Sequence, residues 1–140
     1  MSTSTAVDAV HSLWALFQAR DWAGARALLH DDATMHWVAS GEHLLDADAI
    51  IKVNAIYPEG WSLHVISVDE LRSGDVHSIV EVRHGESRFF ANSRFQLDAG
   101  PGRLIRQITE YWATFEAPPA WRTAEAIGAY RREPLDKNSP

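Results

Sequence analysis

The chain has 140 residues, of which 46% are hydrophobic and 23% charged, and its formal net charge is −6. This balance is typical of one globular domain and excludes a disordered or fibrous chain. Without cysteine the chain has no disulfide and no thiolate nucleophile. The sequence has no stripe of basic residues of the kind that indicates nucleic-acid binding. It also has no apolar run that reaches the ~20 residues of a membrane-spanning helix. The N-terminus shows no secretory signal, so we expect a cytoplasmic protein.

The first part of the chain predicts helices and one strand. Apolar residues recur at three- to four-residue spacing from Val7 to Phe17, which predicts a helix capped by Ser4 or Thr5. Aspartates stand where two further helices would begin, and Asp46 and Asp48 are both possible caps of the third. The expected elements are helices over 4–18, 21–29 and 46–57 and a strand over 33–39.

The rest of the chain predicts strands joined by turns. Gly85-Glu86 separates two strand-like runs and suits a two-residue hairpin turn with glycine first. The expected strands cover 61–71, 76–84, 87–97 and 104–115, followed by a short helix over 123–130 and a polar tail over 134–140. Helices followed by hairpin-linked strands indicate the α+β class, with helices on one face of a mostly antiparallel sheet.

The expected hairpin assigns side chains to two faces of the sheet. The pairs expected on the inner face, toward the helices, are Val82–Phe89, Val80–Ala91 and Ser78–Ser93. On the last strand, alternation gives the inner face Ile108, Glu110 and Trp112, and the outer face Ile105, Tyr111 and Phe115. Phe90 also falls on the outer face. Apolar side chains on that face predict a homodimer formed through it.

Three segments resemble the nuclear transport factor 2-like superfamily, and within it the SnoaL-like proteins. They are 21–34, which ends in Asp-Asp-Ala-Thr, 94–98, and the Ile-Thr-Glu-Tyr-Trp run at 108–112. The resemblance implies a cone-shaped, cystatin-like α+β fold, in which helices and a strongly curved sheet enclose a pocket. It implies one SnoaL-like domain over 1–140, with a core at about 5–117 and a C-terminal extension at 118–140. This superfamily hosts isomerases, dehydratases, epoxide hydrolases, cyclases and non-catalytic modules.

The catalytic groups of two related enzyme families can be sought in this sequence. Ketosteroid isomerases need an aspartate base, a tyrosine and a protonated acid. The resemblance puts Trp37, Leu13 and Ala91 at these three positions, which excludes that mechanism. Limonene epoxide hydrolase-like proteins have an acidic residue before Tyr-aromatic in the final strand, and Glu110 matches it. Their Arg-x-Asp pair is missing, since the nearest segment is Arg83-His84-Gly85.

Glu110 is the candidate catalytic residue, because a carboxyl group on the apolar face would be partly desolvated. A structural pairing with Arg106 is the alternative. The candidate ligand-binding residues are Trp14, Trp37, His64, Phe89, Ser93 and Trp112, and the facing of His64 stays open. His36, His64 and His84 match no motif of the scytalone dehydratase-like sites. No paired-histidine or nucleotide-binding motif occurs, so we predict neither a metal nor a cofactor.

Two classes of function stay open at this point. In both, the expected partner is a small, largely apolar molecule of cyclic or polyketide-like type, and neither nucleic acid nor a membrane. The chain is either a cofactor-free isomerase, cyclase, dehydratase or hydrolase that uses Glu110 for acid–base chemistry, or a non-catalytic ligand-binding or scaffold module. An open cavity with a polar partner for Glu110 would favour the enzyme, and a filled interior the module.

Overall fold

The structure, a computed structural model, describes residues 5–99 and 102–134. Its elements in chain order are α1 (Ala6–Gln18), α2 (Trp22–Ala27), β1 (Leu29–Trp37), β2 (Glu42–Leu44), α3 (Ala47–Ile56), β3 (Trp61–Glu70), β4 (Val76–His84), β5 (Ser87–Leu97), β6 (Ile105–Thr114) and α4 (Ala124–Ile127). Every expected element is present, and the short strand β2 is an addition. The expectations for Ser4 and for the tail over 135–140 lie outside the described residues.

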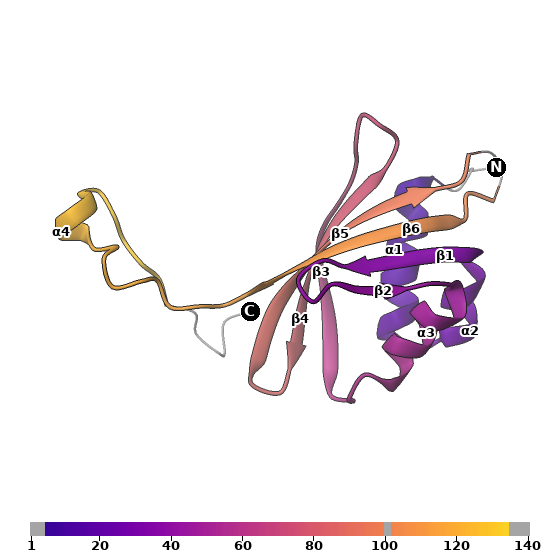
Figure 1. Ribbon diagram of the computed structural model, residues 1–140, viewed down its shortest axis with the longest axis horizontal. Helices are drawn as coiled ribbons and strands as arrows, with labels where there is room; N and C mark the ends of the chain where they lie inside the picture. The colour runs from indigo at the N-terminus through magenta and orange to yellow at the C-terminus, as the bar shows by residue number, and fades with distance from the viewer. Residues whose placement is uncertain (1–4, 100–101, 135–140) are drawn as a thin grey trace.

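The strands form one mixed sheet in the order β2-β1-β6-β5-β4-β3. All neighbouring strands are antiparallel except β1 and β6, which run parallel. Helices α1, α2 and α3 gather on one side of this strongly twisted sheet (Figure 1), where α1 packs against β3 and β4 and α3 against β1. The α+β class and the mostly antiparallel sheet are therefore confirmed.

The helices begin where the sequence places good caps. Thr5 caps α1 in a capping box with Asp8, in which each side chain accepts from the other residue's backbone N–H. Asp21 caps α2, and Asp46, not Asp48, caps α3. The side chain of Asp48 instead accepts a hydrogen bond from Arg26 at 2.9 Å.

The β4–β5 hairpin has the register expected from its turn. Gly85 takes a φ of +58°, which a residue with a side chain rarely adopts. The cross-strand partners include Val82–Phe89, Val80–Ala91 and Ser78–Ser93. Val80, Ala91 and both serines are buried under the helices, so the inner face of these strands is confirmed.

One face assignment on β6 was wrong. Ile105 was expected on the outer face but is fully buried, as is Ile108. The β5–β6 register shifts between Gln96 and Leu97, where Leu97 pairs with Ile105 and Gln96 with Gln107. Strict alternation fails because this bulge adds a residue to one strand. Beyond the bulge the alternation resumes, so Glu110 and Trp112 face inward as expected.

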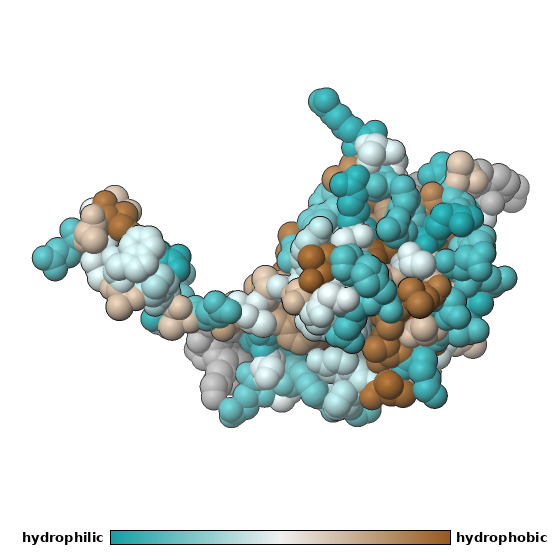
Figure 2. All heavy atoms as spheres, viewed as in Figure 1, coloured by the Kyte–Doolittle hydropathy of each residue, from teal (hydrophilic) through white to brown (hydrophobic). Residues whose placement is uncertain are grey.

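Residues 118–134 leave the sheet as an arm that carries α4 far from the other elements (Figure 1). Trp121 is 71% exposed and Ile127 is 50% exposed. Apolar atoms are visible at the far end of this arm (Figure 2). Within residues 5–99 and 102–134, no helix is long and apolar enough to cross a membrane.

Candidate functional site

A cavity of about 70 Å³ lies between α1, α3 and the inner face of the sheet. Its deep walls are apolar side chains that are almost fully buried, including Leu13, Phe17, Met35, Val82, Phe95 and Ile108. Trp112, which is 36% exposed, and the half-buried Tyr57 and Phe89 stand nearer to solvent. The cavity is therefore deepest toward the core and opens beside β5, β6 and the end of α3.

Glu110 is the only acidic residue among the described residues that line this cavity. Its Oε2 accepts a hydrogen bond from the Ser93 hydroxyl at 2.9 Å, and its Oε1 accepts one from the Trp112 indole N–H at 2.8 Å. Ser93 is directly opposite Glu110 in the β5–β6 register and is fully buried. Two neutral donors from neighbouring positions thus hold the carboxyl group in one orientation.

Desolvation by the apolar walls raises the pKa of the Glu110 carboxyl above its ordinary value. The hydrogen bonds from Trp112 and Ser93 favour the charged form but offset only part of this effect. The alternative partner, Arg106, does not reach Glu110, since its guanidinium pairs with Asp98 at 2.5 Å. Within the described part of the chain, Glu110 has no ion pair, so a carboxyl group with a raised pKa faces the cavity.

Aromatic side chains form the wall next to Glu110. The rings of Trp37 and Trp112 are 4.9 Å apart, and those of Phe89 and Trp112 are 6.1 Å apart. Trp37 is the cross-strand partner of Glu110 on β1. Trp14 lines the cavity from α1, and its indole N–H donates to the buried Ser78 hydroxyl at 3.1 Å. The structure therefore brings Trp14, Trp37, Phe89 and Trp112 to one cavity, with Ser93 behind Glu110.

Two candidate ligand-binding residues do not line the cavity: Ser93 is buried behind Glu110, and His64 lies elsewhere. His64 is exposed and pairs across the strands with Glu81, while its neighbour Leu63 faces the cavity. In β3 a bulge between Val65 and Ser67 separates two apolar stretches. Apolar residues occupy odd-numbered positions in the first stretch and even-numbered positions in the second. The facing of His64 could not be read from alternation for this reason, and the structure places it outside the lining of this cavity.

His36 and His84, the two other histidines considered in the sequence analysis, also lie outside the cavity lining. The ring of His36 stacks on His43 with centroids 4.0 Å apart, which joins β1 to β2. His84 contacts the ring of Tyr57 and the carbonyl oxygen of Glu59. Within residues 5–99 and 102–134, no group of three or more His, Cys, Asp or Glu side chains is placed to hold a metal ion.

Three lining residues whose side chains carry a polar group were not among the candidates: Asn54, Tyr57 and Trp61. Asn54 and Tyr57 are three residues apart at the end of α3, so they share a helix face. This spacing was a usable signal, although the Asn54 amide also donates to its own helix, to the carbonyl oxygen of Ile50. Trp61 starts β3 and shares the inner face with Leu63, the cross-strand partner of Val82.

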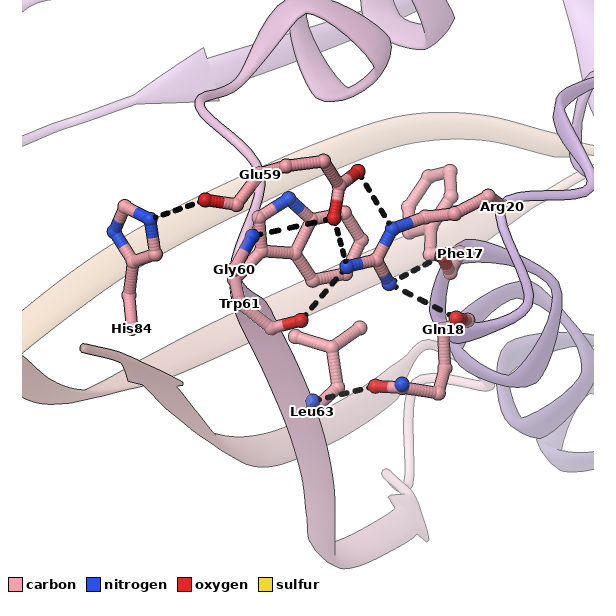
Figure 3. Close-up of polar contacts among 8 residues, drawn as sticks. All are labelled: Phe17, Gln18, Arg20, Glu59, Gly60, Trp61, Leu63 and His84. Carbon is pink, nitrogen blue, oxygen red and sulfur yellow. Dashed lines mark hydrogen bonds and ion pairs between the residues drawn. The ribbon is translucent and has the colours of Figure 1, made fainter.

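Trp61 is held in place by a clamp around Arg20, shown in Figure 3. The Arg20 guanidinium lies 3.3 Å from the centroid of the Trp61 ring. It donates to both carboxylate oxygens of Glu59 and to the backbone carbonyl oxygens of Phe17, Gln18 and Trp61. The clamp ties the α1–α2 connection to the start of β3, and therefore orders one wall of the cavity.

Comparisons with known proteins agree with this fold. No family model and no curated protein sequence matches the chain significantly. Among solved structures, a Kribbella flavida DSM 17836 protein described as a "putative ketosteroid isomerase" is 21% identical, covers 94% of this chain and 91% of its own, and has a TM-score of 0.75. An LEH-like epoxide hydrolase of M. tuberculosis is 18% identical, with coverages of 80% and 82% and a TM-score of 0.64.

A third similar structure is a "putative SnoaL-like polyketide cyclase" of Shewanella denitrificans OS-217, which is 8% identical and has a TM-score of 0.62. It covers 74% of this chain, and the match spans 87% of its own length. The fold defined here is therefore the nuclear transport factor 2-like, cystatin-like fold. The resemblance seen in the sequence to that superfamily and its SnoaL-like members is confirmed at the level of the fold.

Three positions that the resemblance links to ketosteroid isomerase catalysis do meet in space. Trp37, Leu13 and Ala91 all line the cavity. Their side chains supply no carboxyl group and no phenol at these three positions. The remaining chemistry of this cavity is the Glu110 carboxyl, the Tyr57 phenol, the Asn54 amide and the tryptophan N–H groups.

Proposed function

We propose that the cavity binds a small, largely apolar molecule of cyclic or polyketide-like type, and that Glu110 transfers a proton to or from it without a cofactor. The observation that carries this proposal is the Glu110 carboxyl in an apolar cavity, held by two neutral donors. A carboxyl group with a raised pKa exchanges its proton nearer neutral pH, as acid–base catalysis requires. Isomerisation, cyclisation, dehydration and hydrolysis are the reactions in which a single proton-transferring group such as Glu110 would serve.

A second candidate function is binding without catalysis. The cavity volume of about 70 Å³ favours it, because this space admits only a small compound unless lining side chains move. Glu110 is also the only carboxyl group among the described lining residues, so a second acid or base would have to come from Tyr57 or from the ligand.

The experiment that tests the proposal is a screen of small cyclic ketones, lactones and polyketide fragments for binding and turnover, repeated with Glu110→Gln. Glutamine can still accept from Trp112 and can donate to the Ser93 hydroxyl, so the variant should keep the fold without losing stability. Turnover should fall about 10²-fold or more, the usual contribution of a general acid or base.

Glu70→Gln is the matched control, because Glu70 is an exposed glutamate on β3 outside the cavity lining. Ligands that bind equally well to all three proteins without turnover would favour the binding module. Unchanged turnover by Glu110→Gln would overturn the catalytic assignment of Glu110.

A further inference from the structure

Two of the indole N–H groups at the cavity have no acceptor within residues 5–99 and 102–134. Trp14 and Trp112, which also line the cavity, donate to Ser78 and Glu110. Among the residues that the structure describes, the buried Nε1 atoms of Trp37 and Trp61 have no hydrogen-bond partner. A buried N–H without a partner costs free energy, and such groups in native proteins usually meet an acceptor.

Trp37 is the donor placed beside the candidate catalytic group. Its Cα pairs with that of Glu110 in the parallel β1–β6 register, so both side chains leave the same face of the sheet. Its ring is also 4.9 Å from the ring of Trp112, whose N–H holds Glu110. An oxygen atom bound by the Trp37 N–H would therefore lie near the Glu110 carboxyl.

The charges at the cavity argue against an anionic ligand. None of the described lining residues is Lys, Arg or His, and one is Glu110. Arg20 stacks on Trp61, but its guanidinium is engaged by Glu59 and by three backbone carbonyl oxygens. A carboxylate entering the cavity would lose its hydration, meet no cation and approach another carboxyl group.

We propose that the cavity selects neutral molecules that carry an oxygen acceptor, such as the carbonyl of a cyclic ketone, and that the Trp37 indole N–H donates a hydrogen bond to this oxygen. This inference rests on the proposed function, because it assigns the ligand chemistry of the same cavity. Trp37 is then the residue that determines specificity, and it orients the oxygen-bearing end of the ligand toward Glu110.

The test uses three six-membered-ring probes: 2-cyclohexenone, cyclohexene and cyclohexanecarboxylate. The 15N-labelled 140-residue chain should give six indole N–H signals, one for each tryptophan. Titration with 2-cyclohexenone should move the Trp37 indole proton downfield, as a new hydrogen bond requires. Cyclohexene should bind without that shift, and cyclohexanecarboxylate should bind more weakly than the ketone at neutral pH.

Trp37→Phe should weaken 2-cyclohexenone about three- to tenfold, as for a lost neutral hydrogen bond, and leave cyclohexene unchanged. Trp121→Phe, on the exposed arm, is the matched control and should change neither affinity. If Trp37→Phe does not fold, assignment of the wild-type indole signals still gives the decisive shift.

Several outcomes would overturn the inference and leave the proposed cavity in place. They are equal binding of ketone and hydrocarbon with an unmoved Trp37 signal, equal weakening of both probes by Trp37→Phe, or preferred binding of the carboxylate. If none of the probes binds, the proposed function falls together with the inference. A Trp37-dependent preference for the ketone combined with full turnover by Glu110→Gln would support the inference and contradict only the role of Glu110.

Discussion

At the residue scale, the environment of Glu110 combines two opposing effects. The apolar walls penalise its charge, while the Ser93 hydroxyl and the Trp112 N–H stabilise it. The net effect is a raised pKa, in contrast to Glu81 on the other face of the sheet. Burial raises the pKa of Glu81 too, but hydrogen bonds and charge from Arg83 and Arg88 outweigh it, so that pKa is lowered. The two pKa values shift in opposite directions because cations contact Glu81, whereas only neutral donors contact Glu110.

The raised pKa of Glu110 has a consequence for stability. The folded protein holds this proton more tightly than the unfolded chain, so the free energy of unfolding falls as pH rises from the ordinary to the raised pKa. Glu110→Gln lacks this titration. The variant should therefore gain stability relative to wild type across that window and keep the gain above it.

Urea unfolding of both proteins at pH values from about 4 to about 8 measures this difference. Other groups, including Glu81 with its lowered pKa, titrate alike in both proteins. Their contributions therefore cancel in the stability difference between wild type and variant. Glu70→Gln is again the control. A difference that stays constant with pH, or one that favours wild type as pH rises, would mean that the Glu110 carboxyl is not desolvated.

At the element scale, the Arg20 clamp joins two connections that are far apart in the sequence. Arg20 takes a φ of +60° in the turn between α1 and α2, and its side chain is 26% exposed. It reaches the loop before β3, where Glu59 and the carbonyl oxygen of Trp61 accept its N–H groups. Because Glu59 is 68% exposed, the backbone acceptors and the Trp61 ring should contribute more than the ion pair.

Arg20→Ala should lower the free energy of unfolding by about 1–3 kcal/mol, since hydrogen bonds to carbonyl oxygens and the stacking on Trp61 are lost together. Glu59→Gln should cause a smaller loss, and Arg20→Lys an intermediate one because lysine lacks the planar fork. Chemical denaturation of the three variants gives this order. Equal losses for Arg20→Ala and Glu59→Gln would show that the exposed ion pair carries the clamp.

At the scale of the whole molecule, the outer face of the sheet keeps apolar side chains near solvent. Tyr111 is 54% exposed and Phe115 is 40% exposed. Phe115 packs against Phe90 with ring centroids 5.1 Å apart, and Arg88 lies over the Phe115 ring. Grouped apolar side chains on a sheet face are typical of a protein–protein contact, so the homodimer remains our prediction.

Light scattering at micromolar concentration should give about 31 kDa, which is twice the chain mass of 15.7 kDa. Phe115→Asp should shift the protein to monomers with little loss of stability, because the side chain is already partly exposed. Trp121→Ala on the arm is the control and should leave the dimer intact. A monomeric wild type would refute the prediction, and a dimer lost only with Trp121→Ala would place the contact on the arm.

The sequence alone determined the class of fold and most of one cavity wall. Helical spacing, aspartate and threonine caps and the Gly85-Glu86 turn are local signals, because backbone geometry and neighbouring hydrogen bonds produce them. Alternation from this turn correctly predicted that Val82 and Phe89 pair on the inner face, and alternation along the last strand correctly predicted that Glu110 and Trp112 face inward. Such inferences hold wherever the period of two is unbroken.

The tertiary structure decided the side-chain facings and contacts that the two-residue alternation of strands could not predict. A bulge in β6 shifted the alternation and buried Ile105, and a bulge in β3 kept the facing of the exposed His64 from being predicted by alternation. The placement of Tyr57 in the cavity depends on contacts between segments distant in sequence, whereas Asp98 binds Arg106 from the neighbouring end of the β5–β6 pair. The raised pKa of Glu110 has the same origin as the placement of Tyr57, since desolvation comes from walls that only packing brings together.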